Sequence, residues 1–549
     1  MIPINRREAP MDTNECLLQP WECDFNLPDR FNMVDLLLER HVAGDRAHRT
    51  AIICRNRETT YHQLGRMTNT IGNGLIQIGL KPGERVIILL HDGPEYIALF
   101  LAAMKIGAVP VPINMLATAK DMEYFIRDSQ AAVVVMESDL YGKLEMSVQD
   151  MPNLKALVIH GQPIEGIVNL SHLMETCGER LEPHPTSKYD PSYWLYTSGT
   201  TGPPKGVVHL HKDLVYAVET WGRHVVDFSS NDRVLCTSKL FFSYGLNNAL
   251  YLPLYFGASV ILNPDRPLPG TILDLIQRHR PTGLFSVPTA YGQTLNHLEE
   301  TEKTPDLASL RFCVSAGEAL PGSLYRRWLN RFGLEILDGL GSSEVSFIYI
   351  SNRPGKVKEN ASGQPLPGYR IEVRDDTGRV LPPCEVGELW VRSQTLFHSY
   401  WNQPDKSVET LVDGWMKTGD MGYIDADGYF FYCARANDTM KVSGIWVSPL
   451  EVENALLEHP AVAECAVVGE EDEMGLTKPK AFISLKSSYQ PGEELSDDLK
   501  RHVKQTLAPY KYPRSIEFVS DLPKTATGKI QRFKLRRTAS DSCSCISPD

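Results

Sequence analysis

Short apolar runs bounded by polar turns recur along most of the chain and alternate with stretches of helical periodicity. The runs at 85–90, 131–136, 192–197, 259–262, 283–287, 311–315 and 335–338 predict strands, and 96–105 predicts a helix. These strands are apolar on both faces, which is typical of parallel sheets covered by helices. We therefore predict an α/β fold, with a large multi-layer N-terminal domain that contains parallel-rich sheets.

The pattern changes near Tyr432–Asp438 (YCARAND). Helices are predicted beyond it at 449–458 and 495–507, and strands at 463–468 and 481–485. A unit of roughly 110 residues is large enough for its own core. The predicted organisation is an extension at 1–30, a large domain at 31–434, a linker at 435–438 and a small α+β domain at 439–549.

Composition excludes several classes of protein. The 549 residues are 42% hydrophobic and 23% charged, as in ordinary globular proteins, and the net charge is −12. An acidic chain gives no general attraction for nucleic acid or anionic lipid, so neither is predicted as a partner. The amino terminus has no apolar signal region, and the 11 cysteines form no CxxC pair. We predict a cytoplasmic protein.

The strongest local motif is Tyr196–Gly206, YTSGTTGPPKG, which follows an apolar strand. Glycines let backbone N–H groups approach an anion, hydroxyls add donors, and Lys205 adds positive charge. Such a loop suits a triphosphate, although no GxxxxGK[ST] sequence occurs in the chain, which weighs against a P-loop NTPase. The alternative is an ordinary surface turn.

Three more clusters follow: Ser315–Pro321 (SAGEALP), Asp338–Glu344 (DGLGSSE) and Lys417–Asp427 (KTGDMGYIDAD). The first two come directly after predicted strands, where open α/β sheets place their ligands. Glu344 is a candidate oxygen ligand for Mg²⁺, and Asp420 a candidate acceptor for the two hydroxyls of a ribose. Taken alone, each would more often be a turn residue.

Together with Leu522–Arg532 (LPKTATGKIQR), these motifs resemble the adenylate-forming superfamily over residues 50–537. Four segments resemble benzoate-CoA ligases and related aryl-CoA ligases: 239–250 (KLFFSYGLNNAL), 338–355, 441–453 (KVSGIWVSPLEVE) and 507–536. The resemblance implies two half-reactions. A carboxylate attacks the α-phosphate of ATP–Mg²⁺ to give an acyl-AMP and pyrophosphate, and the thiol of coenzyme A then displaces AMP.

The resemblance also implies roles for individual residues. It makes Lys529, Lys441 and Glu344 catalytic, Glu344 also the Mg²⁺ ligand, and 435–438 the hinge of a mobile cap that presents Lys529 in the first half-reaction and Lys441 in the second. It assigns phosphate, adenine, ribose and pantetheine contacts to Thr197, Ser198, Gly199, Thr200, Thr201, Gly202, Lys205, Gly317, Glu318, Ala319, Asp338, Gly339, Ser343, Asp420, Arg435 and Gly444. The aromatic acid would be held by Ser243, Tyr244, Gly341 and Phe347.

The chain departs from the family pattern at two places. The hinge sequence is Ala434-Arg435-Ala436-Asn437, without the usual glycine and final charge. Phe347 stands where benzoate ligases commonly have histidine, and Ser243 where alanine is expected. The second departure leads to the hypothesis that the ring of the acid carries a hydroxyl or amino group. Tyr244, Phe242 and Phe347 are alternatively plain core residues.

We therefore predict an aryl-carboxylate–CoA ligase, a monomer or homodimer. The alternative is a free-standing enzyme that loads the acid onto the pantetheine of a carrier protein, and a luciferase-like oxygenase is a third class. Lys511 and Arg514 are candidates for holding the phosphates of coenzyme A, which favours the ligase. His209 and His211 lack a third ligand nearby, so no metal site is predicted for them.

Overall fold

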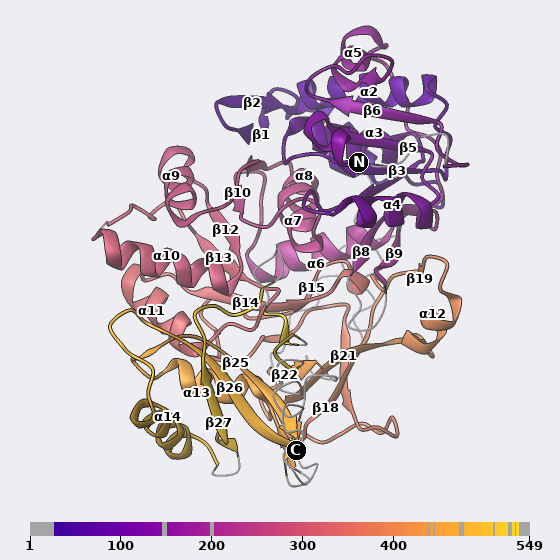
Figure 1. Ribbon diagram of the computed structural model, residues 1–549. Helices are drawn as coiled ribbons and strands as arrows, with labels where there is room; N and C mark the ends of the chain where they lie inside the picture. The colour runs from indigo at the N-terminus through magenta and orange to yellow at the C-terminus, as the bar shows by residue number, and fades with distance from the viewer. Residues whose placement is uncertain are drawn as a thin grey trace, which may run out of the picture.

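The computed structural model describes residues 27–144, 151–197, 203–302, 304–435, 440–442, 445–471, 477–508, 511–524, 530–532 and 534–536. None of the helices in these ranges combines the length and apolar character that crossing a membrane requires. The described chain is a mixture of helices and strands arranged in several layers (Figure 1). The predicted α/β class, with its parallel-rich sheets, is confirmed.

The first part of the chain builds an all-parallel sheet with the order β4-β3-β5-β6-β7. Its strands are β3 (Arg85–Leu89), β4 (Val109–Pro112), β5 (Val133–Glu137), β6 (Ala156–His160) and β7 (Val168–Asn169). The neighbouring helices are α2 (Tyr61–Gln77), α3 (Pro94–Lys105), α4 (Ala119–Asp128) and α5 (Leu170–Thr176). The predicted strands at 85–90 and 131–136 and the helix at 96–105 are all present. Because α3 lies between α2 and the sheet, nearly all of its side chains are buried.

The largest sheet has nine strands in the order β16-β15-β14-β13-β12-β10-β11-β1-β2. Its strands are β1 (Thr50–Cys54), β2 (Arg57–Thr60), β10 (Arg233–Cys236), β11 (Ser259–Leu262), β12 (Gly283–Ser286), β13 (Phe312–Ser315), β14 (Ile336–Gly341), β15 (Ile348–Ser351) and β16 (Gln364–Pro365). The strands from β14 to β1 pair in parallel, and the two edges are antiparallel. The motifs 315–321 and 338–344 therefore leave adjacent parallel strands at the same edge.

The chain up to β15 contains further helices and short irregular elements. They are α6 (Asp213–Val225), α7 (Ser243–Leu246), α8 (Leu252–Phe256), α9 (Pro269–His279), α10 (Pro288–Thr301) and α11 (Gly322–Phe332), with the shorter or irregular elements η1 (Asp35–Glu39), α1 (Arg40–Val42), η2 (Ser138–Lys143), η4 (Asn247–Tyr251) and η5 (Ser343–Val345). The segment α7–η4–α8 is buried along almost its whole length, which agrees with its apolar sequence.

Two antiparallel sheets depart from the parallel pattern. The predicted strand at 192–197 is β8 (Pro191–Thr197), which forms a hairpin with β9 (Lys205–Leu210), and β19 (Ser399–Tyr400) pairs with β9. The other sheet contains β17 (Arg370–Arg374), β18 (Gly387–Arg392), β20 (Leu411–Val412), β21 (Trp415–Ile424) and β22 (Phe430–Arg435), and α12 (Pro404–Thr410) precedes β20. β8 is apolar because Trp194 and Leu195 face different hydrophobic clusters on its two sides. An apolar run therefore does not distinguish a parallel strand from a hairpin strand between two layers.

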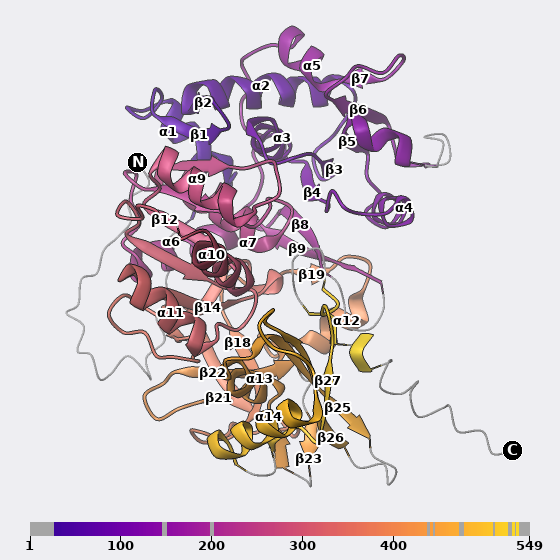
Figure 2. The ribbon, with the colours of Figure 1, turned by 60° about the vertical axis from the view of Figure 1, so that its left-hand side comes forward.

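The described residues after 440 form a smaller unit below the large sheets (Figures 1 and 2). It comprises β23 (Met440–Val442), β24 (Ile445–Val447), α13 (Pro449–Leu457), β25 (Val462–Glu471), β26 (Thr477–Leu485), α14 (Glu493–Thr506) and β27 (Ser515–Phe518). Its two hydrophobic clusters contain only residues from 440 onward. The predicted helices at 449–458 and 495–507 and strands at 463–468 and 481–485 are present. The domain boundary at 435–438 stays a prediction.

Candidate active site

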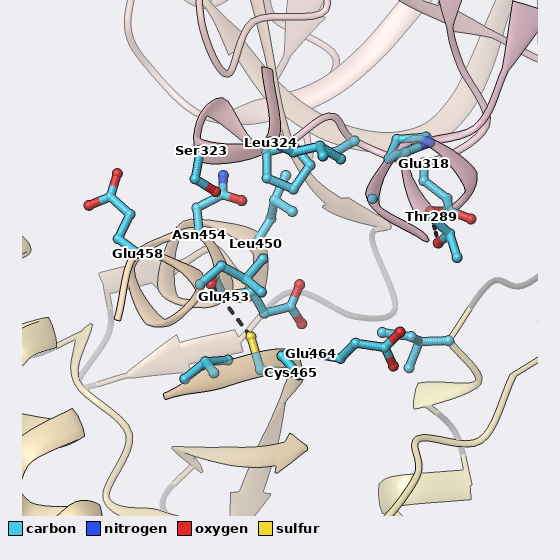
Figure 3. A pocket seen from close by; sticks show the side chains of 18 of the residues that line it. Thr289, Glu318, Ser323, Leu324, Leu450, Glu453, Asn454, Glu458, Glu464 and Cys465 are labelled. Carbon is cyan, nitrogen blue, oxygen red and sulfur yellow. Dashed lines mark hydrogen bonds between the residues drawn. The ribbon is translucent and has the colours of Figure 1, made fainter. Parts of the chain in front are cut away.

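A cleft of about 1780 Å³ lies between the carboxyl edge of the nine-stranded sheet and the C-terminal unit. From the large sheets it is lined by Gly317, Glu318, Ala319, Asp338, Gly339, Gly341, Asp420 and Arg435, and from the other side by α13, β25 and Arg532. Figure 3 shows Asn454 and Leu450 of α13 close to Ser323 and Leu324 of α11, with Glu318 and Thr289 at another part of the wall. Residues that are far apart in sequence and were predicted as nucleotide contacts thus line one cavity.

Asp338 and the loop after β13 form one wall of the cleft. Gly317 has a φ of +87°, a conformation that suits glycine, and this turn leads into Glu318, whose carboxylate accepts a hydrogen bond from Thr289 Oγ1 at 2.8 Å. Asp338 is 6% exposed, and its Oδ1 has no hydrogen-bond partner within the part of the chain that the structure describes. Burial raises the pKa of Asp338 well above its usual value. An acceptor left unsatisfied beside a cavity is suited to an amino group of a ligand.

Asp420 and Arg435 form an ion pair across the β21–β22 hairpin. They are register partners, and Arg435 Nε lies 3.2 Å from Asp420 Oδ1. Arg435 also donates to the carbonyl of Thr418 at 2.9 Å, and the Asp420 carboxylate raises the pKa of Arg435 further above its usual value. The pair fixes the direction of a carboxylate that is almost completely buried at the cleft wall.

Glu344 lies on the tight turn η5, which three groups hold in place. His209 Nε2 donates to the carbonyl of Ser343 at 2.6 Å, and the N–H of Phe397 donates to the carbonyl of Glu344 at 2.8 Å. The hydroxyl of Tyr400 donates to Glu344 Oε1 at 3.1 Å. The turn ends at Ser346, whose φ of +68° is unusual for a residue with a side chain. Backbone strain of this kind is retained where the surroundings determine the conformation, often at functional sites.

Lys205 begins β9 opposite Thr197, so these two residues close the hairpin that contains the predicted phosphate loop. The ammonium group of Lys205 lies 4.3 Å from the centre of the Tyr400 ring. Burial lowers the pKa of Lys205, and Glu344 acts in the opposite direction. Lys205 and Glu344 therefore belong to one electrostatic cluster.

The predicted acid-binding residues belong to one aromatic region. Phe347 packs edge-on against Trp221, Trp221 contacts Phe285, and Phe285 contacts Tyr244. The hydroxyl of Tyr244 donates to the carbonyl of Val314 at 3.2 Å. Aromatic pairs of this kind form rigid apolar walls.

Ser243 and Gly341 lie at the edges of this region. The hydroxyl of Ser243 donates to the carbonyl of Ser346 at 3.4 Å, which connects Ser243 to the turn beside Phe347. A Cβ added at Gly341 would lie 2.8 Å from the carbonyl oxygen of Phe347, so only glycine fits there.

Several predicted residues lie outside the described part of the chain: Ser198, Gly199, Thr200, Thr201, Gly202, Gly444, Asn437 and Lys529. The backbone of Lys441 belongs to β23, and its side chain is not among those described. The predicted roles of these residues stay predictions.

The structure adds residues that the sequence did not single out. Tyr400, Trp221 and Phe285 had no motif around them, and His209 was considered only as a metal ligand. His209 instead joins β9 to the turn η5, and its Nδ1 lies 2.9 Å from Ser346 Oγ and 3.2 Å from Asp213 Oδ2. Pairing of β9 with β19 brings Tyr400 to the site from almost 200 positions away along the chain, a contact that sequence periodicity does not reveal.

Among the described residues, no group of three or more His, Cys, Asp or Glu side chains is arranged to bind a metal ion. Mg²⁺ in nucleotide-dependent enzymes is commonly held by one or two carboxylates together with phosphate oxygens and water. A single carboxylate such as Glu344, next to a hairpin suited to a triphosphate, fits that requirement.

Two family models match the chain. The model described as AMP-binding enzyme covers residues 38–401, and that described as AMP-binding enzyme C-terminal domain covers residues 451–529. The protein belongs to the AMP-binding enzyme family. The predicted adenylate-forming family is confirmed.

The relatives in this family include ligases of aromatic acids. Benzoate–CoA ligase of Thauera aromatica is 45% identical over 93% of this chain and 96% of its own length. The 4-hydroxybenzoate–CoA/benzoate–CoA ligase of Rhodopseudomonas palustris is 40% identical over 92% of this chain and 94% of its own.

Solved structures of similar proteins also include ligases of aromatic acids. An anthranilate CoA ligase in complex with anthranoyl-AMP has a TM-score of 0.90 and 40% identity, covering 94% of this chain and 99% of its own. A benzoate CoA ligase from Burkholderia xenovorans LB400 has a TM-score of 0.84 and 38% identity, covering 92% and 100%.

Proposed function

We propose that the protein is an ATP-dependent aryl-carboxylate–CoA ligase. The observation that carries the proposal is one cleft whose wall contains both the buried acceptor Asp338 and the Asp420–Arg435 pair. The chain that forms this cleft is similar along most of its length to a benzoate–CoA ligase. The cleft volume exceeds that of an ordinary small-ligand pocket, so it has room for a nucleotide together with a second substrate.

The nucleotide would bind along the carboxyl edge of the large sheet. Asp338 and Gly339 with the loop Gly317–Ala319 would frame the adenine, and Asp420 with Arg435 would hold the ribose. Lys205, Thr197 and the loop 198–202 would bind the β- and γ-phosphates, and Ser343 the α-phosphate. Mg²⁺ bound at Glu344 would neutralise part of the phosphate charge.

Adenylation would proceed by attack of the substrate carboxylate on the α-phosphorus, with pyrophosphate leaving. The transition state is strongly anionic, so positioned cations and N–H donors supply most of the stabilisation. We assign the cation between carboxylate and α-phosphate to Lys529. Displacement of AMP by a thiol then gives the thioester, for which Lys441 and Gly444 would form the pantetheine passage.

The acid would lie in the aromatic region between Tyr244, Phe347, Ser243 and Gly341. The hydroxyls of Ser243 and Tyr244 both donate to backbone carbonyls, so they stiffen the walls of the site. Aromatic walls favour a planar ring. A hydroxyl or amino substituent on that ring remains our hypothesis for the natural substrate.

Coenzyme A is the acceptor that we favour over a carrier protein. On the C-terminal unit, Lys504 and Arg514 lie 4.0 Å and 3.8 Å from the centre of the Tyr512 ring, and neither cation has a carboxylate partner among the described residues. This cationic cluster suits the phosphates of a nucleotide. We expect Lys511 to contribute less to binding the coenzyme A phosphates than the sequence suggested, because both oxygens of Glu451 accept hydrogen bonds from its ammonium group.

Residues 439–549 would act as a cap that changes orientation about 435–438 between the half-reactions. The unit at 31–434 would bind ATP and acid throughout. A cytoplasmic location and a monomeric or homodimeric state complete the proposal.

ATP–pyrophosphate exchange with benzoate, hydroxybenzoates, aminobenzoates and medium-chain acids tests the first half-reaction. Mass spectrometry of the product formed with free coenzyme A tests the second. We expect exchange with aromatic acids and an aryl-CoA product. Exchange without any thioester from free coenzyme A would favour the carrier-protein alternative, and a clear preference for benzoate would contradict the substituted-ring hypothesis.

A further inference from the structure

Tyr400 lies between two charged side chains that the proposed reaction uses separately. Its hydroxyl donates to Glu344 Oε1 at 3.1 Å, and its ring lies 4.3 Å below the ammonium group of Lys205. Tyr400 is only 5% exposed, so these contacts are made in a largely desolvated place. Contacts of both kinds are stronger there than in water.

The position of Tyr400 is fixed from several sides. Its backbone pairs with Val207 of β9, two residues beyond Lys205, and its N–H donates to Ser407 Oγ at 2.9 Å. Its ring packs against Phe397, the residue whose N–H donates to the carbonyl of Glu344. The segment 397–400, which ends in β19, therefore supports both the backbone and the carboxylate of Glu344.

Lys205 and Glu344 have opposite charges and act on each other electrostatically, yet they form no ion pair in the structure. A direct pair would place the ammonium group on the carboxylate that is assigned to Mg²⁺. The aromatic ring provides an alternative contact for the cation, and the hydroxyl orients the anion. ATP–Mg²⁺ would then not have to break an ion pair before binding.

We propose that Tyr400 is a positioning residue that keeps Lys205 directed to phosphate and Glu344 directed to Mg²⁺. This inference rests on the proposed function. It assigns separate roles to the two ends of one side chain. The hydroxyl lowers the Mg²⁺ concentration that the reaction needs, and the ring holds the ammonium group of Lys205 in position.

The test is ATP–pyrophosphate exchange measured as a function of free Mg²⁺ and, at saturating Mg²⁺, of ATP. Tyr400→Phe keeps the ring and removes the hydroxyl, so the half-saturating Mg²⁺ concentration should rise about tenfold, as for other residues that support metal ligands, while KM for ATP changes little. Tyr400→Leu removes both contacts and should raise both constants. A half-saturating concentration does not depend on how much of a preparation is folded.

Tyr61→Phe is the matched control, because Tyr61 is also buried and its hydroxyl donates to the carbonyl of Ala258 at 2.7 Å, away from the cleft. It should lower the melting temperature without changing either constant. An unchanged Mg²⁺ requirement in Tyr400→Phe, or an equal shift in the Tyr61 control, would overturn the role of Tyr400. Failure of the wild-type protein to catalyse exchange would instead overturn the proposed function.

Discussion

Individual side chains of the candidate site are oriented by partners that come from distant parts of the chain. Glu344 depends on Tyr400, Phe397 and His209, and Asp420 depends on Arg435. Catalysis by electrostatic stabilisation needs charges that are in place before the reaction begins. The role of each charged residue therefore depends on its neighbours as much as on its own identity.

Asp420→Asn should raise KM for ATP roughly 10- to 100-fold, because it replaces charge-assisted hydrogen bonds to the ribose by weaker neutral ones. KM for the aromatic acid should stay near the wild-type value. Asp425→Asn is the control, since Asp425 lies at the turn of the same hairpin, pairs with Lys358 and does not line the cleft. Steady-state kinetics with each substrate varied separately would show the difference; equal effects on both KM values would contradict the assignment.

At this scale the sequence singled out charged candidates and not the residues that support them. Lys205, Glu344 and Asp420 are candidates because glycines and hydroxyls surround them, and the motifs of Lys205 and Glu344 also follow predicted strands. Tyr400 sits in the segment SYWNQ, which has no such composition, and its partners are residues 205 and 344. Contacts of this kind arise from strand pairing, and periodicity in one sequence carries no information about them.

Strands and helices followed the hydrophobic pattern closely where burial was uniform. β3, β11 and β12 lie where apolar runs predicted them, because both faces of these strands are covered. β8 was predicted equally well as a strand, but its antiparallel partner β9 was not expected from the alternation. Local burial determines that a strand forms, whereas the pairing depends on which layers enclose it.

The hairpin β8–β9 is also joined to the start of the large unit by a buried histidine. His211 Nδ1 accepts a hydrogen bond from the N–H of Met33 at 3.1 Å, and burial lowers the pKa of His211 to about 3. Because this pKa is below that of an unfolded histidine, 6.5, the stabilisation is complete above pH 6.5 and is lost as the pH falls towards 3.

The free energy of unfolding should therefore fall between pH 7 and pH 5, with about 2 kcal/mol due to His211. Glutamine cannot be protonated in this range but keeps an acceptor, so His211→Gln should show a flatter dependence. His91→Gln, at an exposed position, is the control. Urea unfolding at the two pH values measures the effect; parallel pH dependences in wild type and His211→Gln would contradict it.

In the whole molecule, the C-terminal unit contacts the large unit through polar groups near the cleft. Arg326 of α11 pairs with Glu458 at 3.0 Å, Asn454 donates to Asn360 at 3.4 Å, and Ser448 donates to the carbonyl of Cys433 at 2.6 Å. The Arg326–Glu458 pair is nearly half exposed on both sides, and such pairs contribute about 1 kcal/mol or less. An exposed ion pair of this kind is weak enough to be exchanged for another, as the proposed cap with two orientations requires.

The two half-reactions, measured separately for two lysine variants, test the central claim most directly. Pyrophosphate release reports adenylation, and thioester formation from supplied aroyl-AMP and coenzyme A reports the second step. Lys529→Ala should lower adenylation about 100-fold or more and leave thioester formation close to wild type, because its charge is needed only for the first transition state. Lys441→Ala should show the opposite pattern. Equal losses in both half-reactions for both variants would contradict a cap that presents different lysines in turn.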